Sequence, residues 1–137
     1  MEKAKPKILI VDDDPDLGRG LTIRLRANNY DTIQATDGRS AFAMAQEQNP
    51  NVVILDLGLP DGDGFTVLEN FQKSGTLSSV PVIVLTARDP QFNEWKTLKA
   101  GAFAFVQKPA DNSDLLAVIH AAISVTRAKG VQSDLTG

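Results

Sequence analysis

Short runs of consecutive apolar residues alternate along the chain with segments in which apolar residues recur every three or four positions. The continuous runs are rich in β-branched residues, which is typical of strands buried on both faces of a sheet. The spaced positions are typical of helices that bury one face. Strand and helix alternate five times. The pattern therefore predicts an α/β domain with a parallel sheet and right-handed crossovers.

The boundaries of the predicted elements follow from the apolar runs and from the breaking residues between them. The predicted strands are residues 7–11, 31–35, 52–55, 80–85 and 103–106. Helices are predicted from 15 to 28, from 65 to 73, through 92–98 with an end at 100–101, and from 115 to 127. A further helix follows a turn at 37–38, has its apolar face at 41, 44 and 45, and stops at 49–50. Asp14 and Pro15 suit the start of the first helix, and residues 112–114 are expected to cap the last one. Phe92 and Trp95 are expected to be packing residues of the fourth helix.

Length and composition limit the classes of protein that this chain can belong to. Its 137 residues predict one domain, residues 1–127, followed by a small polar tail, 128–137, that is frayed or begins a linker. The net charge of −3 gives no basic field, so direct nucleic-acid binding is not expected. The absence of cysteine and the single histidine exclude thiol chemistry and multi-histidine metal sites. No signal-peptide-like or membrane-spanning run is present, so a cytoplasmic protein is expected.

The stretch from residue 51 to 64 carries the strongest local signal for a functional site. Four apolar residues, 52–55, run directly into Asp56, and Pro60 with glycines at 58, 62 and 64 then forces a loop. Asp56 should therefore lie at the carboxyl end of a central strand, where ligands bind in open α/β sheets. An aspartate that only caps the loop is the alternative, and this stretch alone leaves the two interpretations even.

The other strands also end in residues with distinctive chemistry. Asp12 and Asp13 end the first strand, Thr86 ends the fourth, and Lys108 follows the fifth. A doubly wound sheet brings these ends to one edge, where clustered carboxylates repel one another unless a cation is present. A hard divalent ion such as Mg²⁺ resolves that repulsion. With a lysine and a hydroxyl beside a carboxylate nucleophile, the set predicts a phosphoryl-binding site.

Five motifs in register resemble the receiver domain of bacterial two-component response regulators, of the chemotaxis-regulator type. They are Val-Asp-Asp at 11–13, Leu-Asp-Leu-Gly-Leu-Pro-Asp-Gly-Asp-Gly at 55–64, Leu-Thr-Ala at 85–87, Ala-Gly-Ala at 100–102 and Lys-Pro at 108–109. The resemblance covers about residues 7–127. It implies a flavodoxin-like, three-layer fold with five helices around a five-stranded parallel sheet of order 2-1-3-4-5.

The resemblance also assigns roles to the predicted site residues. It implies that Asp56 is the phosphoacceptor and that Asp13, Asp56 and the backbone carbonyl of Gly58 bind Mg²⁺, with Asp12 acting through water. Thr86 and Lys108 would hold the phosphoryl oxygens, and the Lys108–Pro109 bond is expected to be cis. Gly58 departs from the family, which usually carries a larger side chain there, and this leaves the lifetime of the phosphoryl group open.

The implied function is that of a signalling receiver, which catalyses only its own phosphorylation and dephosphorylation. The donor would be a histidine kinase or a histidine phosphotransfer protein. Thr86 and Phe105 occupy the switch positions, and the face formed by the fourth helix, fifth strand and fifth helix would pass the signal to an effector or, on activation, to a second copy of the chain. The chain is expected to be a stand-alone regulator or a fragment of a longer regulator or hybrid kinase.

Two alternatives use the same sheet or the same nucleophile. An FMN-binding flavodoxin shares the strand order but needs neither the three aspartates nor the lysine. A haloacid-dehalogenase-type phosphatase also uses an aspartate nucleophile, but it expects a second aspartate two residues later, where this chain has Gly58. A calcium loop starting at Asp12 lacks the required glycine and the final glutamate.

Overall fold

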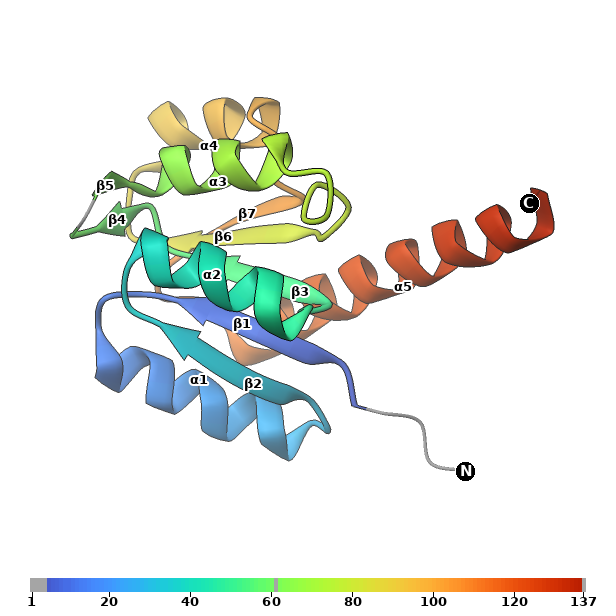
Figure 1. The fold of residues 1–137 in the computed structure, drawn as a ribbon. Helices are drawn as coiled ribbons and strands as arrows, with labels where there is room; N and C mark the ends of the chain where they lie inside the picture. The colour runs from blue at the N-terminus through green and yellow to red at the C-terminus, as the bar shows by residue number, and fades with distance from the viewer. Residues whose placement is uncertain (1–4, 61, 137) are drawn as a thin grey trace.

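The computed structural model describes residues 5–60 and 62–136, with side chains described as far as residue 126. Within that part, parallel strands form a five-stranded sheet in the order β2-β1-β3-β6-β7 (Figure 1), which confirms the predicted fold and strand order. The strands are β1 (Lys7–Val11), β2 (Asp31–Ala35), β3 (Val52–Leu55), β6 (Val82–Thr86) and β7 (Ala104–Gln107).

Helices cover both faces of this sheet, as the three-layer prediction requires (Figure 1). The helices are α1 (Pro15–Ala27), α2 (Gly38–Gln48), α3 (Gly64–Lys73), α4 (Pro90–Lys99) and α5 (Asn112–Thr136). One apolar cluster joins α1 and α5 to the side chains of Ile8 and Ile10 on β1. A second joins α2 and α3 to Leu9 and Val11. Because alternate residues of β1 enter opposite clusters, the strand is buried on both faces.

A short antiparallel pair, β4 (Gly58–Leu59) with β5 (Gly62–Asp63), lies where the sequence predicted only a loop. The pair is too short to give an alternating apolar pattern, so nothing in the apolar pattern signalled it. It follows β3 directly and leads into α3, and it thereby fixes the segment after Asp56 against the start of that helix.

Aspartates cap the helices at the carboxyl edge of the sheet. The carboxylates of four of them accept a first-turn backbone N–H of α1, α2, α3 and α4, namely Asp14, Asp37, Asp63 and Asp89. For α5 the predicted cap within residues 112–114 is wrong by at least one position, because Asp111 accepts the N–H of Ser113 and precedes the helix. These caps satisfy backbone donors that a helix cannot pair internally.

The prediction that Phe92 and Trp95 pack against the rest of the domain is wrong. Their side chains are 74% and 70% exposed, and Leu98 is 43% exposed. Thr97 is the buried residue of α4. The spacing of three between the apolar residues identified the helix correctly, but the face that meets the sheet lies on the other side of it.

The last helix is longer than predicted. The sequence placed its end near residue 127, whereas α5 continues to Thr136 and extends beyond the sheet (Figure 1). The assignment of residues 128–137 to a tail outside the domain stays a prediction, because their side chains lie outside the described part. Across the described residues, no helix combines the length and apolarity that a membrane span requires.

Gly64 allows the close approach of α3 to the end of β3. A Cβ at Gly64 would lie 2.5 Å from the Leu57 Cα and 2.6 Å from the Asp56 carbonyl oxygen, and both are backbone atoms that cannot easily move. The Gly64 N–H donates to the Leu57 carbonyl at 2.8 Å. A glycine is therefore required here by space rather than by backbone conformation.

We predict that Gly64→Ala lowers the free energy of unfolding by about 1–3 kcal/mol, because the methyl group overpacks against rigid backbone. Urea unfolding followed by circular dichroism measures the change. Gly75→Ala is the matched control, since a Cβ there meets no atom within 4 Å, and it should stay within about 0.5 kcal/mol of wild type. Equal effects of the two substitutions would contradict the steric argument.

Candidate functional site

The register of the sheet brings the predicted site residues to one edge. Val11 pairs with Leu55, and Leu55 pairs with Val84, so β1, β3 and β6 end side by side. The N–H of Asp56 donates to the Val11 carbonyl at 2.9 Å and continues the ladder past the last strand residue. Asp12 and Asp56 therefore leave neighbouring strands at the same level.

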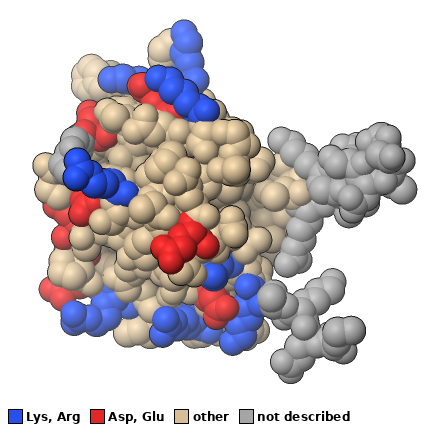
Figure 2. Space-filling model, in the orientation of Figure 1, with Lys and Arg blue, Asp and Glu red and all other residues tan. Residues whose placement is uncertain are grey.

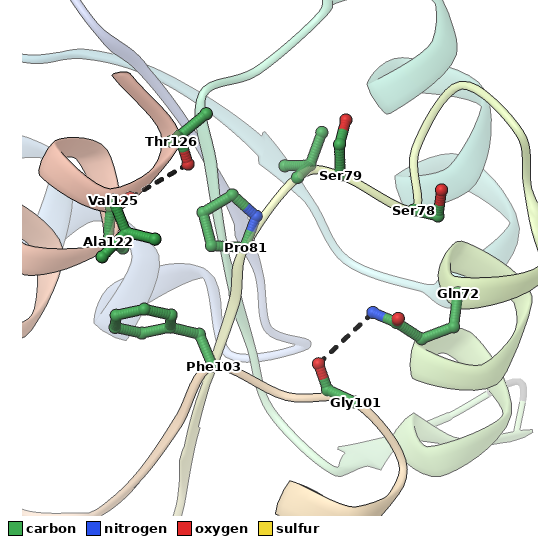
Figure 3. Close-up of a pocket in the computed structure, with 10 residues that line it drawn as sticks. Gln72, Ser78, Ser79, Pro81, Gly101, Phe103, Ala122, Val125 and Thr126 are labelled. Carbon is green, nitrogen blue, oxygen red and sulfur yellow. Dashed lines mark hydrogen bonds between the residues drawn. The ribbon is translucent and has the colours of Figure 1, made fainter. Parts of the chain in front are cut away.

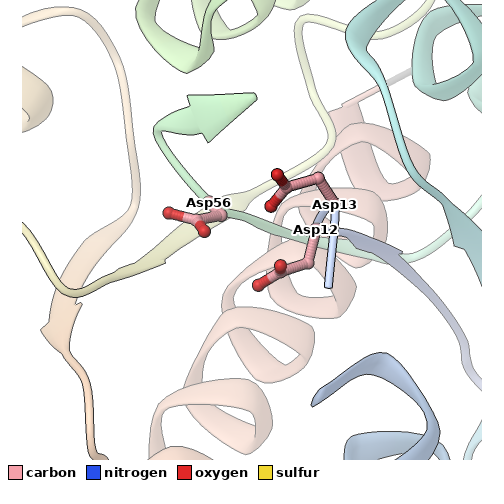
Figure 4. Close-up of side chains that lie close together, drawn as sticks. All are labelled: Asp12, Asp13 and Asp56. Atoms are coloured by element: carbon pink, nitrogen blue, oxygen red, sulfur yellow. The ribbon is translucent and has the colours of Figure 1, made fainter. Parts of the chain in front are cut away.

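Three carboxylates meet at this edge. One oxygen each of Asp12, Asp13 and Asp56 lies within 4.8 Å of the others, and their carboxylates gather in one place (Figure 4). Asp12 is buried, Asp56 is half-buried and Asp13 is exposed, so the cluster reaches from the interior to the solvent. Figure 2 shows acidic side chains gathered along the left side of the molecule, the side on which the strands end in Figure 1.

Lys108 supplies the positive charge of the cluster. Its Nζ donates to Asp12 Oδ2 at 2.7 Å and to Asp56 Oδ2 at 3.1 Å, and its side chain is only 20% exposed. The backbone holds it there, because the Lys108 N–H donates to the Thr86 carbonyl at 2.8 Å. The Lys108–Pro109 bond that follows is cis, as predicted.

The environment shifts the ionisation of two members of this cluster. Burial raises the pKa of Asp12, and the hydrogen bonds from Lys108 and from the Asp14 N–H only partly offset that effect. Burial alone would lower the pKa of Lys108, but its hydrogen bonds with Asp12 and Asp56 and the attraction of their charges together outweigh burial and raise that pKa. Lys108 therefore stays charged, whereas Asp12 is held as a carboxylate only against a desolvation penalty.

The donor set fits a magnesium ion. Mg²⁺ prefers hard oxygen ligands and is usually bound by one or two carboxylates together with water and phosphate oxygens. The cluster offers one oxygen from each of three aspartates as a ligand, and the ammonium group of Lys108 balances only part of their negative charge. A divalent cation would remove the remaining repulsion between the carboxylates.

Thr86 and Phe105 lie on neighbouring strands next to this cluster. Thr86 is the last residue of β6, is 1% exposed and accepts the Arg88 N–H on Oγ1 at 3.3 Å. Phe105 pairs with Val84 and is partly buried against the apolar cluster under α2 and α3. Both predicted switch positions are therefore close in the sheet; Thr86 is buried and Phe105 is partly exposed.

Arg88 also makes polar contacts at this edge of the sheet, and its sequence pattern had not marked it as a site residue. Its guanidinium donates to the Asp63 carboxylate at 3.3 and 3.4 Å and to the Leu57 carbonyl at 3.2 Å. A charged residue two positions after Thr86 was the available signal, but its partners are 25 and 31 residues away in the sequence.

A pocket of about 440 Å³ lies at the opposite edge of the sheet, near the start of β6 and β7 (Figure 3). Gln72 and Gly101 border it and share a hydrogen bond of 3.4 Å, and Phe103, which is 37% exposed, forms one wall. Among the described residues that line it, none carries a charge and none is a predicted site residue. The acidic edge is therefore the better candidate for chemistry.

Ligands bind at the carboxyl edge of a doubly wound sheet, and the carboxylate–lysine cluster of this domain lies at that edge. Residues 8–120 match the family described as the response regulator receiver domain. The chain belongs to this family and is a signalling domain of the two-component type. The alternative of an FMN-binding flavodoxin has no support.

Relatives of known type agree with this assignment. The transcriptional regulatory protein KdpE of Mycobacterium tuberculosis is 42% identical over 116 residues, which are 85% of this chain and 50% of KdpE. Protein PilH of Pseudomonas aeruginosa is 31% identical over 86% of this chain and 98% of PilH. The chain thus spans about half the length of KdpE and nearly all of PilH.

Solved structures show the same fold. A CheY-like response regulator receiver domain protein from Methanospirillum hungatei matches 91% of this chain and 98% of its own, with a TM-score of 0.85 and 27% identity. The BeF₃-activated receiver domain of Klebsiella pneumoniae RstA matches 85% of this chain and 97% of its own, with a TM-score of 0.77 and 28% identity.

We predict that the cluster makes Asp13→Asn more stable than wild type without divalent cations and less stable with them. Removing an exposed like charge should raise the free energy of unfolding by up to about 1 kcal/mol in chelator. Excess Mg²⁺ should stabilise wild type by about 2.7 kcal/mol at 100 times its dissociation constant, and the variant by much less. Urea unfolding with and without Mg²⁺ measures both.

Asp31→Asn is the control for this experiment, because it removes the same charge at the opposite edge of the sheet, at the start of β2. Its response to Mg²⁺ should equal that of wild type. If Mg²⁺ stabilises Asp13→Asn as much as wild type, Asp13 is not part of a metal site.

Proposed function

We propose that this domain takes a phosphoryl group onto Asp56 from the phosphohistidine of a histidine kinase or a histidine phosphotransfer protein. The observation that carries the proposal is the double hydrogen bond of Lys108, which holds one ammonium group between Asp56 and Asp12. An exposed lysine would be free to turn away, whereas this one is fixed against the carboxylate that is to react.

Each residue at the edge has a part in the transfer. An Asp56 carboxylate oxygen attacks phosphorus, the new O–P bond forms, and the P–N bond to the donor histidine breaks. Lys108 and the Thr86 hydroxyl then bind phosphoryl oxygens. Asp12, Asp13, Asp56 and the Gly58 carbonyl would hold Mg²⁺, which supplies positive charge to the phosphoryl oxygens when it is bound.

Hydrolysis ends the signal in this scheme. Gly58 leaves space beside Asp56, since a Cβ at Gly58 would meet no atom within 4 Å. The Gly58 N–H, 3.3 Å from Asp56 Oδ1, remains the nearby backbone donor. Water therefore has an open approach on this side of the phosphoacceptor.

We assign the output to the surface formed by α4, β7 and α5, with a downstream effector or a second copy of the chain as its partner. Phe92, Trp95 and Leu98 expose an apolar stripe along α4. The buried side chain of that helix is Thr97, whose hydroxyl has no hydrogen-bond partner among the described residues. A helix held by so little apolar burial moves at low cost, as a switched surface must.

Incubation with a small acyl phosphate and Mg²⁺ should add one phosphoryl group to wild type and none to Asp56→Asn, because the amide is a poor nucleophile. Intact-mass spectrometry measures the addition. Asp31→Asn serves as the control for the loss of one negative charge and should be labelled like wild type. Equal labelling of Asp56→Asn and wild type would show that another residue accepts the group.

Activation should change the fluorescence of Trp95 on α4. Beryllofluoride with Mg²⁺ mimics the phosphoryl group, so Thr86 should move toward it and Phe105 should turn inward to fill the space left behind. The change should shrink in Thr86→Ala, because the hydroxyl that follows the phosphoryl oxygens is gone. NMR shifts that stay near the aspartates and never reach residues 92–107 would contradict this switch.

A further inference from the structure

Arg88 joins two loops at the carboxyl edge of the sheet. It lies in the loop between β6 and α4, and its guanidinium bonds to Leu57, which precedes β4, and to Asp63, the last residue of β5. Leu57 directly follows Asp56, and Asp63 caps the first turn of α3. One side chain from the β6–α4 loop therefore holds both ends of the segment that follows the phosphoacceptor.

The Leu57 carbonyl is a well-fixed anchor for this contact. It accepts the Gly64 N–H at 2.8 Å and the Arg88 guanidinium at 3.2 Å, which engages both of its lone pairs. The Leu57 side chain is fully buried. Arginine suits the task, since its planar fork reaches a carbonyl and a carboxylate at the same time.

Arg88 is also bonded to the switch residue through its backbone. Its N–H donates to Thr86 Oγ1 at 3.3 Å. If Thr86 turns toward a phosphoryl group on Asp56, either this bond breaks or the loop at residues 87–88 follows the hydroxyl. The guanidinium contacts with Leu57 and Asp63 resist the second movement, so the resting position of Thr86 depends on them.

We propose that Arg88 is a positioning residue that holds the β6–α4 loop, and through it Thr86, in the resting arrangement. This inference rests on the proposed function, because it concerns the switch that phosphorylation of Asp56 operates. Contacts made in the resting arrangement disfavour the active one by their own free energy. Removing these contacts lowers the free-energy difference between the resting and the active arrangement. A ligand that binds the active arrangement then binds more tightly.

The size of the effect follows from the exposure of the partners. The Arg88 and Asp63 side chains are 38% and 44% exposed, so their ion pair alone contributes little. The bond to the shielded Leu57 carbonyl adds to it. We expect Arg88→Ala to lower the half-saturating concentration of beryllofluoride roughly threefold to tenfold at fixed Mg²⁺.

The experiment compares four proteins by titration with beryllofluoride in excess Mg²⁺, followed by Trp95 fluorescence and by amide NMR. Arg88→Ala should bind more tightly than wild type, and Arg88→Lys should lie between them, since an ammonium can pair with Asp63 but cannot fork. Arg19→Ala is the matched control, because it removes an exposed pair with Asp16 at 71% and 85% exposure, and it should match wild type.

A second readout separates positioning from a general loss of stability. Without beryllofluoride, the amide shifts of residues 92–107 in Arg88→Ala, which lie outside the substituted loop, should lie on the line between the resting and the saturated wild-type shifts. Asp63→Asn, which keeps a side-chain oxygen for the cap, should move them the same way, and combining it with Arg88→Ala should add little.

The outcomes distinguish this inference from the function on which it rests. Unchanged or weaker binding by Arg88→Ala, beside normal binding by wild type, overturns the role of Arg88 and leaves the proposed function standing. Shifts that leave the line overturn it as well, because they report a distorted structure. Failure of wild type itself to bind beryllofluoride overturns the proposed function and this inference together.

Discussion

The carboxylate cluster at the carboxyl edge of the sheet is the constraint on which the rest of this structure depends. Asp12 is almost completely buried, and Asp13 and Asp56 lie beside it. Buried like charges are unfavourable unless a partner of opposite charge is fixed near them. Lys108 is that partner, and the end of β7 and the Thr86 carbonyl hold its backbone in place. The ion pairs of the site therefore depend on the sheet register, because a slip of one residue would turn these side chains to other faces.

Close backbone contacts connect the cluster to the rest of the domain. Gly64 lets α3 approach the backbone of Asp56 and Leu57, and Arg88 ties the same segment to the loop that leads into α4. A negative charge added to Asp56 would therefore act on a segment whose backbone contacts leave it little room to move. In α4 the polar Thr97 is the buried residue, so little apolar burial holds this helix.

The two ends of the sheet have different chemical characters. The carboxyl edge carries the clustered charges, four aspartate helix caps and the arginine contact. The amino edge carries a pocket bounded by Phe103 and the start of β6, and the described residues that line it are uncharged. α5 runs past that pocket, and Ala122, Val125 and Thr126 of this helix line it.

The sheet order followed from the family resemblance, whereas the sequence by itself determined the strands, the helices and the membership of the acidic cluster. Those features depend on neighbours along the chain: a buried strand is one apolar run, and the residue after it must lie at the edge of the sheet. Tertiary structure alone decided that Phe92 and Trp95 face solvent, that β4 pairs with β5, and that Arg88 bonds to Leu57 and Asp63. Helical spacing shows that apolar residues share a face, but which face is covered depends on elements distant in sequence. A guanidinium likewise finds its acceptors only after the loops that carry them have been brought together by the sheet.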